Sequence, residues 1–396
     1  MMIMNNEKII NDLAIQVKHH LDCRIELDYS LLGQDLGCVI FLYYSSKYLN
    51  NKTSYIDLYL DKVLSGTLKK LNIGSYCNGL AGLGIGLQQL EKDGFIDGVN
   101  EALNCVDERL QPCLDEMLKV HDIDFLHGSI GIGFYLLSRL NDKNAGEAPE
   151  YMLKKIILHL EKTKKQLFNS IYWRLNEKDQ NKQYNISLSH GSASVMLLLA
   201  KMSTCISDDP YNSMIKNMLE GNINYMLSQE QDPEKYKSYF PTFPKETDST
   251  NSMSRLAWCY GDPGIGMALK QTAEILNDKE LYSHSVDILL HSAERRNDSH
   301  NHVFDAELCH GAAGLSLIFG KLYSDTKNKI FEDASIYWTN RMLQMSVINN
   351  GVITFPTFTY KNPQWDIRYG ILDGLSGIGL LLSGAQNALC KFMILT

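Results

Sequence analysis

The sequence lacks long apolar runs, and it has only 9 prolines among its 396 residues. Its longest apolar stretches, such as 195–200 and 378–382, are far shorter than the roughly 20 residues that cross a bilayer as a helix. The first residues show no basic segment followed by an apolar stretch, so we expect no secretion signal. These absences predict a soluble, cytoplasmic protein with no direct membrane insertion.

Basic charge is also scarce. Lys and Arg number 38 against 46 Asp and Glu, which gives a net charge of −8. Nucleic acid is therefore excluded as the main partner, because binding to phosphates needs a basic face. The chain contains no Gly-x-x-x-x-Gly-Lys-[Ser/Thr] loop, so no ATP site is expected. The nine cysteines are odd in number and scattered, which is not typical of a disulfide framework.

The feature that organises the chain is a short Gly-x-x-Gly motif, followed each time by an apolar run. Internal repeats of this kind indicate a fold built from stacked units. The six copies are Asn78–Gly82, His127–Gly131, His190–Ser194, Tyr260–Gly264, His310–Gly314 and Asp373–Gly377. Only the third copy departs from the pattern, since Ser194 replaces its second glycine.

The segments between the copies have room for two helices each. Apolar residues recur at helical spacing in 148–168, 212–227 and 279–292, whereas 235–253 and 349–366 have the composition of long loops. Helix pairs that cannot bury their apolar faces alone must stack on their neighbours. We therefore predict an all-α fold, an α/α toroid of six inner and six outer helices, as one domain over residues 1–396. Each motif would begin an inner helix.

Polar residues precede the first glycine in every copy. They are Asn78, His127, His190, Tyr260, His310 and Asp373. One residue earlier, the fourth and fifth copies carry Cys259 and Cys309. If the inner helices run parallel, these positions converge at one end of the central cavity, which predicts a functional site there.

The most specific candidate site is a metal site formed by Cys259, Cys309 and His310. Two thiolates and one imidazole suit Zn²⁺, and three protein ligands leave the fourth position open, as in catalytic zinc sites. Each cysteine precedes a predicted helix N-terminus, where the helix dipole favours a thiolate. The alternative is two buried thiols and a structural histidine. The matching positions in the repeat favour the metal.

Two segments together resemble the signature of the LanC-like lanthionine cyclases. They are Trp258-Cys259-Tyr260-Gly261 and Cys309-His310-Gly311, and the order of the six motifs extends the resemblance over nearly the whole chain. The resemblance implies that Cys259, Cys309 and His310 bind zinc.

The resemblance also assigns four residues to catalysis. Asp124 and His190 are similar to the family's active-site Asp and His, Arg255 to its pocket arginine, and Tyr260 follows the first zinc ligand as it does in the family. Each has a structural alternative: a helix cap for Asp124, a packing role for His190, a loop ion pair for Arg255 and a cavity wall for Tyr260. We expect His127 and Asp373 to support the site without direct involvement.

The implied activity is the addition of cysteine thiols to dehydroalanine or dehydrobutyrine in a ribosomally made peptide, which forms lanthionine or methyllanthionine rings. The implied partners are a dehydrated precursor peptide, a separate dehydratase and an export transporter, in a membrane-bound complex. An enzyme that adds glutathione to dehydrated residues would have the same zinc site. A zinc-stabilised scaffold that only binds peptides is a further alternative.

Two other toroid enzymes are weaker alternatives. A glycosidase with Asp124 and Asp373 as its carboxylate pair leaves both cysteines unexplained. A prenyltransferase subunit uses a carboxylate among its zinc ligands.

Overall fold

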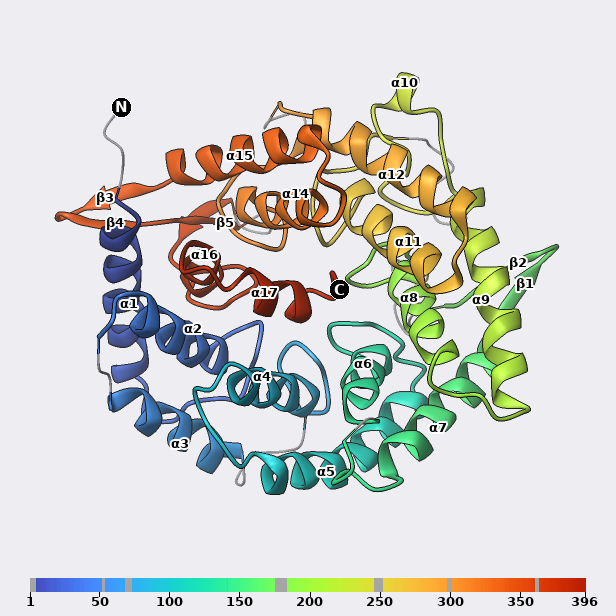
Figure 1. Cartoon of the computed structure of the whole chain (residues 1–396), viewed down its shortest axis with the longest axis horizontal. Helices are drawn as coiled ribbons and strands as arrows, with labels where there is room; N and C mark the ends of the chain where they lie inside the picture. Colours follow the sequence, from blue (N-terminus) through green and yellow to red (C-terminus); the bar gives the residue numbers. More distant parts are fainter. Residues whose placement is uncertain are drawn as a thin grey trace. The chain divides into compact units, whose positions relative to one another are not determined.

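The structure is a computed structural model that describes residues 5–51, 54–67, 73–140, 142–174, 184–245, 252–297, 301–359 and 363–396. The chain divides into two compact units, both built mainly from helices (Figure 1). Unit 1 comprises Met1–Ile73, Cys77–Val99 and His302–Thr396, and unit 2 comprises Gly74–Tyr76 and Asn100–Asn301. Among the described residues, none of the helices combines the length and the apolar character needed to cross a bilayer.

Unit 1 groups its helices around α2 and α14. Its elements are α1 (Asn6–Asp22), α2 (Asp35–Tyr48), α3 (Tyr55–Thr67), α4 (Leu80–Lys92), α14 (Ala312–Thr326), α15 (Lys329–Gln344), β3 (Val347–Asn349), β4 (Val352–Thr354), β5 (Thr357–Thr359), β6 (Gln364–Asp366), α16 (Leu375–Leu382) and α17 (Gln386–Phe392). Helix α2 packs against α1, α3, α4 and α16, and α14 packs against α15, α16 and α17.

Unit 2 is arranged in the same way around α8. Its elements are α5 (Asn100–Lys119), α6 (Ser129–Arg139), α7 (Ala148–Thr163), β1 (Lys165–Leu167), β2 (Ser170–Tyr172), α8 (Ser192–Ser203), α9 (Tyr211–Ser228), α10 (Pro233–Tyr236), α11 (Asp262–Leu276) and α12 (Lys279–Glu294). Helix α8 packs against α6, α9 and α11, and α12 packs against α11.

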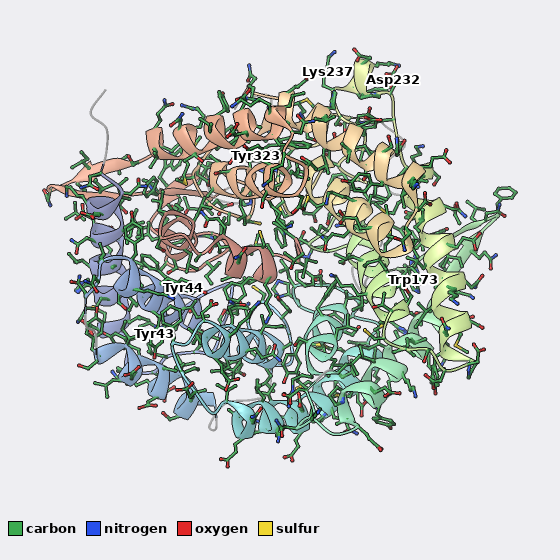
Figure 2. The ribbon with its side chains drawn as sticks, in the orientation of Figure 1. Tyr43, Tyr44, Trp173, Asp232, Lys237 and Tyr323 are labelled. Atoms are coloured by element: carbon green, nitrogen blue, oxygen red, sulfur yellow. The ribbon has the colours of Figure 1, made fainter. Side chains whose placement is uncertain are left out.

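The helices are of two kinds. Those that follow a glycine motif are buried almost all round, as residues 192–200 of α8 are. Their partners bury one face only: α12 buries Leu281, Ser285, Ile288 and Leu289, which recur at helical spacing. Polar contacts join the two kinds in unit 1, where Tyr43 of α2 donates to Asp57 of α3 at 2.7 Å (Figure 2).

Five of the motif helices, α4, α6, α8, α14 and α16, share one way of beginning. The N–H of the first helical residue donates to the carbonyl seven residues earlier, which closes a loop over the helix end. The bonds are Leu80 to Ile73 (2.7 Å), Ser129 to Asp122 (2.9 Å), Ser192 to Asn185 (2.9 Å), Ala312 to Asp305 (3.0 Å) and Leu375 to Arg368 (3.0 Å). Such bonds satisfy backbone donors that the helix itself leaves without a partner.

The second glycine of the motif lets the first helical turn rest on this loop. A Cβ built at Gly131, Gly264, Gly314 or Gly377 would lie 2.0–2.1 Å from a carbonyl oxygen of the preceding loop, which no real side chain tolerates. Ser194 stands at the same position of α8, where it is fully buried and its hydroxyl donates to the Gly191 carbonyl at 2.8 Å. The exception therefore keeps its own anchor to the helix start.

A seventh helix begins in a similar way, which the sequence prediction of six did not include; the N–H of its first residue, Asp35, donates to the Asp28 side chain at 3.4 Å. Helix α2 follows Gln34 in the place of the first glycine, and Gly37 stands in the place of the second. The N–H of Gly37 donates to the Ser30 carbonyl at 3.3 Å, as the N–H of Gly314 does to Glu307. Within the described residues the motif helices are thus α2, α4, α6, α8, α11, α14 and α16.

The helices predicted over 212–227 and 279–292 are confirmed as α9 and α12. The prediction of one helix over 148–168 is wrong at its end, because α7 stops at Thr163 and the chain turns into the β1–β2 hairpin.

The prediction of a long loop over 349–366 is also wrong. The described part of this segment joins β3 to β4 and β5 to β6 in two antiparallel hairpins. Asn350 and Gly351 take left-handed angles at the first turn. An Asn-Gly pair between stretches that contain β-branched residues is a sequence signal for a hairpin, which the composition of the segment obscured. Residues 360–362 lie outside the described residues. In the segment 235–253, the irregular backbone is confirmed after α10, and residues 246–251 lie outside the described part.

The contact between the second glycine and its loop can be tested within α14. Gly314→Ala places a Cβ 2.0 Å from the Leu308 carbonyl oxygen, which is far inside van der Waals contact. We therefore expect the free energy of unfolding to fall by about 2–3 kcal/mol. Gly320→Ala is the matched control, since its Cβ meets nothing closer than the Ser335 hydroxyl at 3.2 Å, and its effect should stay within about 1 kcal/mol. Urea unfolding measures both, and equal effects would contradict the proposed role of the contact.

Candidate active site

The loops before α6 and α8 bring Asp124 and His190 together in unit 2. The Asp124 Oδ2 lies 2.5 Å from the His190 Nδ1, and both side chains remain partly exposed, at 18% and 30%. The other oxygen of Asp124 accepts the N–H of His127 at 2.8 Å. Asp124 therefore does more than stabilise its own loop, since it also orients a histidine of the next motif.

Two aromatic rings lie close to His190. The Tyr260 ring centroid is 5.9 Å away, and the His127 ring stacks at 6.2 Å. The backbone N–H of His190 donates to Ser187 Oγ at 3.2 Å, and the Tyr260 hydroxyl accepts from Asn185 at 3.0 Å. The histidine is thus held through its backbone, through one ring nitrogen and by its neighbours.

The loop before α11 carries Arg255, Cys259 and Tyr260. Its attachment to the His190 loop runs through the Cys259 carbonyl, which accepts from Ser189 Oγ at 3.1 Å. The loop folds tightly enough that a Cβ at Gly261 would lie 2.0 Å from the Arg255 carbonyl, and Gly261 has a φ of +92°. Glycine is favoured at such an angle. The cysteine is 4% exposed.

Asp262, the first residue of α11, anchors this region. Its fully buried carboxylate accepts the N–H groups of Tyr239 and Phe240, each at 3.0 Å, and faces Arg295 at 3.6 Å. Burial raises the pKa of Asp262 to about 6, although Arg295 opposes the shift. The segment after α10 is in this way tied to the helix that follows Cys259.

In unit 1, Cys309 and His310 are fixed separately. The N–H of Cys309 donates to the Leu372 carbonyl at 2.9 Å. The Glu307 Oε1 accepts the backbone N–H of His310 at 3.2 Å and lies 2.8 Å from its Nδ1. The Glu307 side chain is 1% exposed, and its Oε2 has no hydrogen-bond partner among the described residues. Burial raises the pKa of Glu307 to about 7, with His310 opposing the shift.

Asp305 joins this loop to the neighbouring hairpin. Its two oxygens accept the N–H groups of Glu307 at 3.4 Å and of Phe358 at 2.9 Å. Ligand atoms of Asp305, Glu307 and His310 lie within 4.8 Å of one another, a spacing that a metal ion could also use. The hydrogen bonds within the loop already account for this cluster, so we assign it to the framework of the site.

Asp373, expected to have a supporting role, pairs with Arg368, and its carbonyl accepts from Thr357 at 2.8 Å. Asp124 is likewise paired with His190. In a glycosidase one of the two carboxyl groups must act as an acid. Each carboxyl group already has a partner of its own, and a glycosidase would leave both cysteines unexplained.

Sequence reasoning missed Ser187 and Glu307. Both stand four residues before the first glycine of their motif, the position that Asp124 holds in the second copy. In all three copies this side chain accepts the N–H of the residue that precedes the glycine. Reading the repeat four residues upstream would have found them.

The three predicted zinc ligands divide between the units, with Cys259 in unit 2 and Cys309 and His310 in unit 1. Their chemistry fits zinc: two thiols, and an imidazole whose Nδ1 faces a carboxylate, so that its Nε2 is the nitrogen left for a metal. The ligand set itself stays a prediction.

The comparisons with known proteins define first the class and then the family. Nisin cyclase matches with a TM-score of 0.72 and 19% identity over 98% of this chain and 96% of its own. A sugar epimerase from a ruminal bacterium matches with a TM-score of 0.43 and 10% identity over 71% of this chain and 81% of its own. A C. acetobutylicum glycoside hydrolase from family 105 matches with a TM-score of 0.40 and 12% identity over 96% of this chain and 99% of its own. The first likeness confirms the predicted all-α class, an α/α toroid. A family model described as "Lanthionine synthetase C-like protein" matches residues 26–388, and the chain belongs to that family.

The pKa of Glu307 gives a pH prediction. In the folded protein the pKa of Glu307 is raised to about 7 from its ordinary value of 4.5. The contribution of this group to the free energy of unfolding is therefore fully present below about pH 4.5 and is lost as the pH rises through about 7. In metal-free protein, the unfolding free energy of the wild type relative to Glu307→Gln should therefore decrease over this range. Urea titrations of both proteins in chelator check it, and a difference that is flat with pH would contradict the assignment.

Proposed function

We propose that this protein is a zinc-dependent cyclase, which adds peptide cysteine thiols to dehydroalanine or dehydrobutyrine and so forms thioether rings. Membership of the lanthionine synthetase C-like family supports the reaction class. The observation that carries the mechanism is the 2.5 Å contact between His190 and Asp124, which places an oriented acid–base group beside Tyr260.

Cys259, Cys309 and His310 would hold the zinc. A free thiol has a pKa of about 8.5 and is mostly protonated at neutral pH. When bound, the metal would supply the deprotonation of the substrate thiol, which makes the sulfur a nucleophile. Each cysteine lies three residues before the first residue of a motif helix, α11 or α14, near the helix end whose dipole favours a thiolate.

The chain's own residues would then manage the proton. The sulfur forms a bond to the β-carbon, the electron pair of the double bond moves to the carbonyl as an enolate, and the α-carbon takes up a proton. His190 is the proton donor in this proposal, because imidazole titrates near neutral pH. Asp124 keeps the ring oriented through Nδ1, so the other nitrogen faces the substrate. Arg255 stabilises the enolate oxygen, and Tyr260 lines the position of the reacting atoms.

The substrate would be a dehydrated precursor peptide. A separate dehydratase would supply it, and an export transporter would receive the product, in a cytoplasmic or membrane-associated complex. In this proposal the whole chain, 1–396, acts as one domain. The hairpin β5–β6 is a candidate peptide contact, because Trp365 is 58% exposed and Phe358 beside it bonds to the Asp305 loop.

Two alternatives remain, and each predicts a different result. An enzyme that adds glutathione to dehydrated residues would use the same residues with a tripeptide thiol, and a competition between glutathione and a peptide cysteine separates the two. A zinc-stabilised scaffold would bind a dehydrated peptide without forming rings, and it would unfold when the metal is removed.

Metal content is the first test. We expect about one zinc per chain in the wild type and a loss of zinc in Cys309→Ala, since three ligands are needed for a stable site. Cys390→Ala, which removes a buried thiol of α17, is the matched control and should keep its zinc. Elemental analysis measures all three proteins. No zinc in wild-type protein after supplementation would contradict the proposal.

Chelation adds a second readout of the same site. Helical content by circular dichroism and ring formation by mass spectrometry should separate, with ring formation lost first. Simultaneous loss of both would favour the scaffold.

The acid–base pair is tested by Asp124→Asn and His190→Asn. Both variants should keep zinc, because neither residue is a proposed ligand, while the rate of cyclisation falls by roughly 10²–10⁴, the range for removal of a general acid. Single-turnover assays on a dehydrated peptide measure the rate. His127→Asn is the control beside the pair and should lose far less. A normal rate in His190→Asn with zinc retained would remove the proton-donor role.

A further inference from the structure

We infer that Glu307 is a positioning residue for His310: its carboxylate accepts the Nδ1–H of the imidazole and fixes the tautomer whose Nε2 is presented to the metal. This inference rests on the proposed zinc-dependent function. It adds a residue that lies outside the signature Cys309-His310-Gly311.

The first support is geometric. Glu307 Oε1 lies 2.8 Å from His310 Nδ1 and 3.2 Å from the backbone nitrogen of the same residue. One oxygen therefore fixes both the chain and the ring of His310. An imidazole held at Nδ1 by an acceptor carries its proton there, which leaves the lone pair on Nε2 for a metal.

The second support is burial. Glu307 is 1% exposed, and its Oε2 finds no hydrogen-bond donor among the described residues. A buried carboxyl group with so few partners costs folding free energy and is uncommon unless it has a role. A cation bound at the Nε2 of His310 would offset this cost, because it makes the ring and its Nδ1–H more positive and so stabilises the carboxylate that accepts this hydrogen.

The third support comes from the repeat. Asp124 stands at the same motif position as Glu307, and each accepts the N–H of the residue before its glycine. Asp124 is one methylene shorter, and it meets the ring of the next motif's histidine, His190. The longer Glu307 instead turns back to the ring of its own motif. The same register position thus orients one imidazole for proton transfer and another for metal binding.

The framework around Glu307 restricts its movement. Asp305 accepts the Glu307 N–H, and the Glu307 carbonyl accepts the N–H of Gly314 in the first turn of α14 at 3.3 Å. The carboxylate therefore belongs to the same closed loop as the two proposed ligands. A residue whose backbone N–H and carbonyl are both hydrogen-bonded can hold its side chain in a fixed direction toward a neighbour.

Zinc affinity tests the inference directly. In Glu307→Gln, the amide can present either its oxygen or its NH₂ group to Nδ1, so the tautomer is no longer fixed; we expect the dissociation constant for Zn²⁺ to rise by 10–100-fold. Competition with a chromophoric chelator measures it on the full-length protein. The absorption spectrum of the Co²⁺-substituted protein should shift as well, which a purely structural defect elsewhere would not cause.

Four further variants, including His310→Ala itself, make the result specific. Glu307→Ala serves if the Gln variant does not fold, and the same loss is expected. In a His310→Ala background, Glu307→Gln should cause no additional loss, because the residue acts through the imidazole. Asp124→Asn removes the carboxylate at the equivalent position of unit 2 and should bind zinc as the wild type does.

The outcomes separate the two proposals. A folded Glu307 variant with wild-type zinc affinity and an unchanged Co²⁺ spectrum would overturn the positioning role while leaving the zinc site intact. A wild-type protein that binds no zinc would overturn both. A loss of affinity that persists unchanged in the His310→Ala background would also overturn it, since the effect would then not pass through the ring.

Discussion

Each motif helix rests directly on the loop that precedes it, and this contact positions the loop side chains. At the second glycine, no room is left for a Cβ, as the 2.0 Å approach to the Leu308 carbonyl at Gly314 shows. The loop is then closed by a hydrogen bond from the first helical residue, from Ala312 to Asp305 in this copy. Close approach and closure together leave the loop residues with few conformations, so side chains on the loop are held without long secondary structure beneath them.

This constraint explains why chemistry concentrates one to four residues before the glycine. The residue at minus four is directed to the backbone of the residue at minus one, and Asp124, Ser187 and Glu307 all use it in this way. The serine adds a contact with the Ser189 hydroxyl at 3.5 Å and reaches no imidazole ring in the part of the chain that the structure describes. A carboxylate has further oxygen lone pairs, and it uses them on an imidazole, of His190 in one case and of His310 in the other. The repeat thus supplies a fixed frame, and the choice of one residue type decides what the frame orients.

The sequence allowed the helical class and the glycine frame to be predicted, because spacing in a repeat reports equivalent positions directly. Asp124 and His190 were named from the family resemblance, and their contact comes from the structure. It did not reveal α2 as a motif helix, since Gln34 stands where the pattern required glycine. The composition of 349–366, with Pro, Thr and aromatic residues, favours a loop, whereas the Asn350-Gly351 turn is the signal that indicates a hairpin. Glu307 was missed for a different reason. Its place in the repeat, four residues before the glycine, marks it as an acceptor for the loop backbone, but only the coordinates show that its carboxylate also meets the Nδ1 of His310.

The adjacent residues Cys309 and His310 pose a particular physical problem. If both bind zinc as proposed, two neighbouring side chains share one stretch of backbone, and a shift that improves the position of one ligand disturbs the other. The structure separates their anchors: the backbone of Cys309 is tied to Leu372, whereas the ring of His310 is tied to Glu307. The ring can then keep its orientation without depending on the rotamer of the thiol. A zinc ion held as proposed would benefit from that independence, because the imidazole already has its direction before the metal binds and less ordering free energy is lost on binding.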